Sequence, residues 1–240
     1  MKHHLRSVFL TLAAAGALSA APVTFSGSSG NLAAAVTFEK AGSSLIVTLA
    51  NTAQLSKVPA DVLTAVFFDI GGVNPVLTPV SAVLPAGSLT CLNSVCASAG
   101  GLNVGGEWAY KANPGVDGRE YGISSSGLGV FGQANFNGLN LEGPGSVGGM
   151  EYGLIAGQYQ PNGGLAGNTV VKTSVVFTLS GFGGREVSEI GRVLFQYGTG
   201  LDEPRFPGDP QTPPEVPEPA TMAAMGSGLV GLAPLKLRKR

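Results

Sequence analysis

Five carboxylates in the glycine-rich middle of the chain are the first side chains that could do chemistry. Two carboxyl groups that face each other across a groove can cleave a glycosidic bond. Spacing along the chain does not place any two of these acids opposite each other, and most acids on a soluble surface are simply solvated. A glycosidase with paired carboxylates is therefore one hypothesis among three. The acids are Glu107, Asp117, Glu120, Glu142 and Glu151.

Three aromatic residues in the same region could bind a ligand instead. Trp108 and Tyr110 are two residues apart, so on a strand they share one face, and Tyr121 follows. Exposed rings could stack on sugars, whereas rings that face inward would belong to the core, where a lone Trp commonly packs. We favour the core for these residues and keep them as a possible ligand face. A carbohydrate- or calcium-binding β-sandwich module is thus the second hypothesis.

Nucleophilic catalysis and zinc binding lack their usual side chains. The only histidines are His3 and His4, so the rest of the chain offers no imidazole base for a Ser or Cys nucleophile. Zinc would lack ligands as well. Residues 127–132 match G-x-G-x-x-G, but a poor helix sequence follows, and we interpret them as a turn. We therefore expect no metal, no cofactor and no enzymatic activity.

Cys91 and Cys96 are the only cysteines, in a C-x4-C spacing. In an oxidising compartment two cysteines this close are expected to form one disulfide that closes a small loop. A reactive redox pair is the alternative. The disulfide is the prediction that we carry forward.

The segments that must position these residues have the pattern of short strands. They are rich in β-branched residues, bounded by Gly, Pro, Ser or Asn, and no long segment has helical periodicity. We predict an all-β fold, an antiparallel and jelly-roll-like β-sandwich, over residues 21–201. Residues 100–150 hold 15 of the 37 glycines, and we expect short strands there, with a tight turn at Asn137-Gly138. The predicted strands are 45–49, 62–70, 76–84, 170–179 and 193–197.

Both ends of the chain have the pattern of membrane-directed signals. Residues 1–20 have a basic start, a short apolar stretch and small residues before Ala21, as in a secretory signal peptide with a signal helix. Residues 202–215 are rich in proline and predict a linker. The 16 uncharged residues 220–235 would form a transmembrane helix of about 24 Å, somewhat short for a bilayer. A basic anchor follows at Lys236, Arg238, Lys239 and Arg240.

The C-terminal 25 residues resemble a known sorting signal. Val216, Pro217, Glu218 and Pro219, followed by the apolar helix and the basic end, are similar to the PEP-CTERM signal of bacterial exosortase substrates. The resemblance implies that an exosortase recognises the Pro-Glu-Pro motif and removes the helix. It also implies an inner-membrane-tethered precursor in a Gram-negative bacterium, and then a product at the cell surface or in the extracellular matrix.

The charge of the middle of the chain agrees with an exported protein. Two of the 14 basic residues lie in the first 20 residues and four at the C-terminus, whereas all 15 acidic residues lie between, which leaves a net charge of −7 there. An acidic surface argues against nucleic acid as a partner. The first hypothesis is accordingly a non-catalytic surface or matrix protein. Its partners would be the secretion machinery, an exosortase, transiently the inner membrane, and an extracellular polysaccharide or biofilm.

Overall fold

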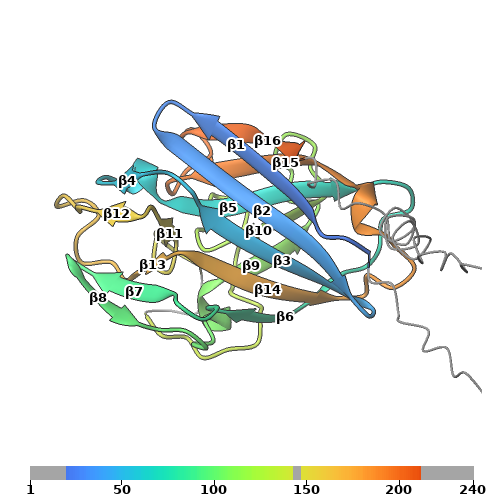
Figure 1. Cartoon of the computed structure of the whole chain (residues 1–240), viewed down its shortest axis with the longest axis horizontal. Helices are drawn as coiled ribbons and strands as arrows, with labels where there is room; N and C mark the ends of the chain where they lie inside the picture. The colour runs from blue at the N-terminus through green and yellow to red at the C-terminus, as the bar shows by residue number, and fades with distance from the viewer. Residues whose placement is uncertain (1–19, 143–146, 212–240) are drawn as a thin grey trace, which may run out of the picture.

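The computed structural model describes residues 20–142 and 147–211, and these residues form an all-β fold (Figure 1). One continuous 14-stranded sheet folds back on itself, so that two layers pack face to face as a β-sandwich. Phe38 in one layer and Phe68 in the other meet with ring centroids 5.0 Å apart. The predicted sandwich is confirmed at this level, since the apolar faces of the two layers form one core.

The front layer in Figure 1 contains a meander of consecutive strands. Each strand pairs antiparallel with the next, because the turns at Gly30 and Gly42 have positive φ values of 59° and 60°, which glycine adopts without strain. In a jelly roll, by contrast, Greek keys separate successive strands. The jelly-roll-like topology is therefore not the one observed. The layer runs β6 (Thr78–Val83), β14 (Ser174–Ser180), β3 (Ser44–Asn51), β2 (Leu32–Ala41), β1 (Val23–Ser29).

The back layer is centred on β5 (Leu63–Ile70), whose residues are all buried. One edge of β5 bonds to β15 (Ile190–Tyr197), and other strands continue the layer on the opposite side. They include a parallel pair, β11 with β13, so the sheet is not purely antiparallel. These strands are β10 (Tyr121–Ser124), β9 (Ala109–Ala112), β11 (Leu154–Ile155), β13 (Val170–Lys172), β7 (Leu89–Leu92) and β8 (Val95–Ser98).

Strand β16 (Arg205–Gln211) connects the two layers. Its residues 205–208 pair with β15, and its residues 209–211 pair with β1. Residues 202–215 were expected to be a linker, but 205–211 belong to the sheet and Phe206 is buried against Tyr197. The linker prediction was wrong for 205–211 because it took a proline-rich composition to exclude a strand. Each half of β16 bonds to one neighbour only, and such a strand tolerates proline where a fully paired one would not. The β domain thus extends to Gln211.

Smaller elements complete the described chain. β4 (Leu55–Ser56) and β12 (Gln158–Tyr159) form a separate parallel pair. Three short 3₁₀ helices are η1 (Pro59–Asp61), η2 (Gly105–Glu107) and η3 (Val187–Glu189). Within residues 20–142 and 147–211 no helix has the length and apolarity needed to cross a membrane. The expected signal helix and transmembrane helix fall on residues 1–19 and 212–240, outside the described residues.

The glycine-rich middle agrees only partly with its prediction. β9 and β10 form the expected short strands, and every other predicted strand segment contributes to a strand. Residues 125–142 and 147–153 instead run as irregular chain, and Asn137 forms an isolated bridge to Ser81 rather than a hairpin turn. This segment lies against the edges of the sheet, where its polar groups find partners on the strands.

Candidate functional site

The two ends of the described chain leave the domain side by side. Thr24 near the start of β1 lies opposite Gln211 at the end of β16. The start of β1 also pairs with the end of β2, so both chain ends are at the end of the sandwich that carries the β2–β3 turn (Figure 1). The Cα atom of Val216 is five residues beyond Gln211, so it lies within about 18 Å of it even in a fully extended chain. Any enzyme that cuts at the sorting motif must therefore work close to the folded domain.

Loops at this end of the domain are bonded to one another. Gly71 donates its backbone N–H to the carbonyl oxygen of Glu189 at 2.8 Å, and Lys40 forms an ion pair of 2.7 Å with Glu186. Two valines in the β5–β6 loop stand out from this surface, Val73 with 82% and Val76 with 87% of its area exposed. The surface from which both ends of the described chain emerge thus has hydrogen-bonded loops and contains both polar and apolar groups.

The three candidate ligand-binding aromatics are buried in the core. Trp108 and Tyr121 are almost fully buried, and Tyr110 is nearly so. Trp108 packs edge-on against Phe177 with centroids 4.8 Å apart, and Tyr121 stacks on Phe68 at 5.5 Å. The possible ligand face is corrected accordingly, because rings that fill the space between the layers cannot stack on a sugar. The core interpretation of these residues is the one that the structure supports.

Burial also changes the acidity of two of these tyrosines. Burial, and then the neighbouring carboxylate of Glu120, raises the pKa of Tyr121 to about 12. The pKa of Tyr110 is raised by burial and by its neighbour Tyr121. The Tyr121 hydroxyl donates a hydrogen bond to the carbonyl oxygen of Pro75 at 2.9 Å. Both phenols are therefore neutral at physiological pH and act as packing groups.

The five candidate acids hold loops in place. The carboxylate of Glu107 accepts hydrogen bonds from the backbone N–H groups of Leu141 and Glu142. Glu120 accepts one from the N–H of Ile70 at 3.2 Å, and Asp117 lies 3.3 Å from the guanidinium of Arg205. The last two are bonded as well: Glu142 accepts the hydroxyl of Thr169, 27 residues along the chain, and Glu151 accepts the N–H of Gly149.

Metal binding finds no cluster of suitable side chains in the part of the chain that the structure describes. No group of three His, Cys, Asp or Glu residues within 20–142 and 147–211 could hold a metal ion. Residues 127–132 form a turn, in which Val130 and Phe131 donate their N–H groups to the carbonyl oxygen of Gly127. Residues 133–142, which follow this turn, form no helix, so the described chain lacks here the helix N-terminus on which a dinucleotide fold holds its pyrophosphate.

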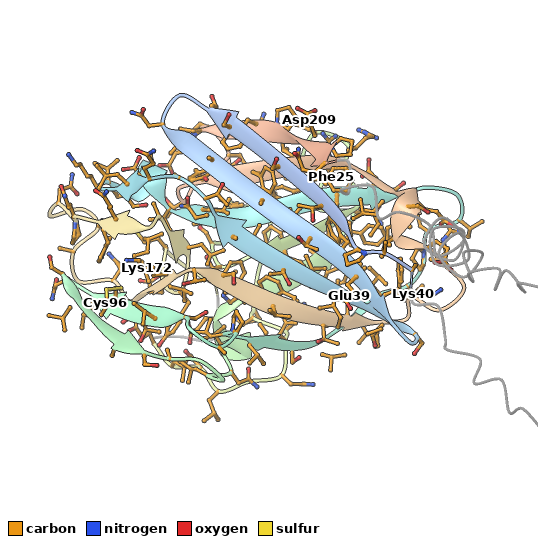
Figure 2. The ribbon with its side chains drawn as sticks, viewed as in Figure 1. Phe25, Glu39, Lys40, Cys96, Lys172 and Asp209 are labelled. Carbon is orange, nitrogen blue, oxygen red and sulfur yellow. A yellow bond between two sulfur atoms is a disulfide. The ribbon has the colours of Figure 1, made fainter. Side chains whose placement is uncertain are left out.

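Cys91 and Cys96 form the expected disulfide. They are directly opposite each other in the β7–β8 hairpin, whose turn has Asn93 at a φ of 53°. Cys91 is buried in a small cluster with Val62 and Ile155, whereas Cys96 is exposed. In Figure 2 Cys96 lies at the opposite end of the sandwich from Lys40. The bridge therefore fixes a hairpin far from the chain ends.

Two adjoining polar grooves were not anticipated from the sequence. The larger, of about 710 Å³, lies beside the β1–β2 turn and contains Asn31, Gln54, Lys57 and Asp61. The smaller, of about 480 Å³, extends past Ser28 to Asp209 in β16. Hydroxyl, amide and charged groups line them, without an aromatic ring. No motif in the sequence marks them, because segments far apart in the chain create them.

Comparison with known proteins identifies the C-terminal segment. Residues 215–240 match the family model of the PEP-CTERM protein-sorting motif. Neither the curated proteins nor the solved structures gave a match. The motif marks the chain as an exosortase-dependent exported protein, made as a membrane-anchored precursor and processed at the cell surface. The sorting residues Val216, Pro217, Glu218 and Pro219 and the basic anchor lie outside the described residues.

Proposed function

We propose that this chain is a non-catalytic surface or extracellular-matrix protein whose folded β domain is freed from its membrane helix by an exosortase. The main support for this proposal is the position of β16. This strand ends at Gln211, and only residues 212–214 separate it from the matched sorting segment. A cut within that segment leaves the whole sheet intact, so processing delivers a folded domain and not a damaged one.

The non-catalytic character is supported by what the candidate catalytic groups do. Glu107 and Glu120 are occupied by backbone N–H groups, and Asp117 is paired with Arg205. A catalytic pair would instead present two carboxyls to a common groove. Association with an extracellular polysaccharide follows from the implied role of the sorting signal and from the net acidic, exported body.

Processing is tested by replacing Pro217, Glu218 and Pro219 with alanine in cells that contain the exosortase. We expect the variant to remain as a membrane-held precursor, while the parent chain loses its C-terminal helix. Replacing Pro213 and Pro214 with alanine is the matched control, because these prolines precede the matched segment. Intact-mass analysis of the recovered protein reads out both cut sites and any attached glycan or lipid. Equal processing of parent and variant would refute the sorting role.

A carbohydrate-binding module is the second candidate, and the polar grooves favour it. Asn31, Gln54 and Lys57 supply donors and acceptors of the kind that sugars bond to. The test is retention of the processed protein on the extracellular polysaccharide of its own host. Loss of retention in Gln54→Ala together with Lys57→Ala, with unchanged folding, would establish this candidate, and undiminished retention would exclude the groove.

A further inference from the structure

Within residues 20–142 and 147–211, other segments of the chain bond to the outer sides of β6 and β9, whereas the outer side of β8 is open. Ser81 and Val83 on the outer side of β6 form bridges to Asn137 and Asn103. At β9 the side-chain amide of Asn135 takes up both backbone groups of Tyr110. Its Oδ1 accepts the N–H of Tyr110 at 2.7 Å, and its Nδ2 donates to the carbonyl oxygen of Tyr110 at 2.8 Å. Among the described residues β8 pairs with β7 alone.

The backbone groups that β8 turns outward follow from its register. Cys91 and Cys96 are opposite each other with Cα atoms 4.0 Å apart, a spacing typical of the non-hydrogen-bonded pairs of an antiparallel ladder. Leu89 and Ser98 form the next such pair, because the two kinds of pair alternate. The N–H and C=O groups of Cys96 and Ser98 therefore point away from β7, to the open edge.

β8 is short, but its edge lacks the charged residues, prolines and bulges that would oppose strand-to-strand association. Edge strands are commonly protected by charged residues, proline or bulges. The sequence of β8 is Val-Cys-Ala-Ser, all four residues are exposed, and Val95 has 75% of its area exposed. No Asp, Glu, Lys or Arg occurs anywhere in residues 70–106, which include β6, β7 and β8. The disulfide holds the hairpin in one register, so the edge is preformed.

We propose that β8 pairs antiparallel with β8 of a second copy of this chain, so that the mature protein is a dimer. With the two-fold axis at Ala97, Cys96 of each copy faces Ser98 of the other. Each such pair exchanges both of its N–H···O bonds, since these are the outward-facing groups. The short side chain of Ala97 leaves room at the axis.

Charge argues for a second copy as the occupant. The rest of the body is acidic, so two copies repel each other least where their uncharged stretches meet. A foreign peptide added to an edge needs pockets for its side chains to be selected. The two grooves lie instead at β1, β2 and β16. Because the edges of β6 and β9 are covered, pairing at β8 stops at a closed dimer.

Sedimentation of the processed protein, with its cut site verified by intact mass, tests this proposal. Because a small interface is weak, we expect a reversible monomer–dimer equilibrium in which the dimer becomes detectable as the protein concentration is raised to about 1 mM. Ser98→Pro removes an outward N–H that β7 does not use, and should weaken dimerisation at least about tenfold. Ala97→Lys places like charges opposite each other and should weaken it about fivefold. Ala112→Lys, in the exposed part of β9, is the matched control and should dimerise like the parent.

Hydrogen exchange of the unaltered protein gives a second readout that does not depend on any variant folding. The amides of Cys96 and Ser98 should become protected as the protein concentration rises, whereas amides in the β1–β2 pair should not change. A protein that stays monomeric at every concentration overturns the proposal. A monomer whose β8 edge instead binds an extended peptide of another protein overturns it as well. A dimer that neither Ser98→Pro nor Ala97→Lys weakens also overturns it. Since cleavage is verified beforehand, failure here is distinct from failure of the sorting role.

Discussion

Thr24 and Gln211 lie opposite each other across the β1–β16 pair, so the strand that begins the domain is paired with the strand that ends it. The same β16 bonds through residues 205–208 to β15 in the other layer. The final strand before the sorting segment is therefore the link that joins both layers. Completion of the fold depends on a part of the chain that composition alone would assign to a spacer.

Truncation after β16 should leave the domain stable, whereas truncation before β16 should unfold it. A chain that stops after Gln211 keeps every described strand and should unfold at the same temperature as the processed protein. A chain that stops after Pro204 loses β16, leaves the edges of β1 and β15 open and uncovers Phe195 and Tyr197, which pack on Phe206. We expect the shorter chain to be insoluble or unfolded, as measured by circular dichroism and thermal unfolding. A stable fold without β16 would contradict this role.

The junction of β1 with β16 should be sensitive to a single methyl group. A Cβ atom on Gly27 would lie 2.3 Å from the carbonyl oxygen of Pro207, which is backbone and cannot move aside easily. Gly27→Ala should therefore cost about 1–3 kcal/mol of unfolding free energy. Gly191→Ala is the control, since a Cβ there meets nothing within 4 Å. Equal stability of the two variants in urea would show that the junction is not tightly packed.

Strand segments with strong local patterns were predictable, and the corner strand was not. Residues 62–70 and 193–197 have compact apolar runs, and both lie in strands at the centre of the back layer. β16 contains Pro207 and Pro210, and proline, which has no N–H to donate, argues against a strand inside a sheet. Its place depends on partners almost the whole chain away, such as Thr24, and no local pattern carries that information.

In the candidate site, too, the features set by nearby residues were predictable and those set by distant segments were not. The C-x4-C spacing was sufficient to predict the disulfide, because both partners are local. The inward direction of Trp108 and Tyr110 was favoured but not decided by alternation, since a strand has two faces and only the second layer determines which is covered. The polar grooves and the open edge of β8 had no sequence signal, because they depend on which segments lie beside one another.

Asn135 should be a larger contributor to stability than its place in an irregular segment suggests. Its amide pairs with both backbone groups of Tyr110. Asn135→Asp keeps an acceptor for the N–H but turns an oxygen toward the carbonyl of Tyr110, so we expect a loss of about 1–3 kcal/mol. Asn168→Asp is a useful comparison, because its amide donates a hydrogen bond to the backbone carbonyl oxygen of Leu165 at 3.2 Å. Urea unfolding of both variants measures the difference, and a larger loss at residue 168 would be the contrary result.

The two cysteines should respond differently to substitution. Loss of the bridge alone releases a very short loop, which corresponds to about 2 kcal/mol in the chain-entropy account. Cys96→Ser should show that loss, because its side chain is exposed. Cys91→Ser should cost more, since it also places a hydroxyl among Val62, Ile155 and Val170. Unfolding in urea, with the reduced parent as reference, checks the order, and a smaller loss in Cys91→Ser would show that its apolar surroundings are unimportant.

The buried tyrosines predict a loss of stability at high pH. Burial raises the pKa of Tyr152 to about 12, with Glu142 and Glu107 adding to the shift, and it raises the pKa of Tyr197 as well. An unfolded tyrosine titrates near its ordinary pKa of about 10. The folded state therefore keeps protons that the unfolded state has lost between these values. This contribution is fully present below about pH 10 and is lost as the pH rises through about 12.

Urea unfolding at several pH values from about 9 to about 12, together with phenolate absorbance, tests this dependence. We expect the free energy of unfolding to fall across that interval, and the absorbance to rise later in the folded protein than in the urea-unfolded one. Tyr152→Phe removes one of the titrating groups, so its stability should fall less steeply with pH than that of the parent. Since the ring remains, its stability at neutral pH should change little. A parent protein whose phenols all titrate as they do in urea would show that these rings are open to solvent.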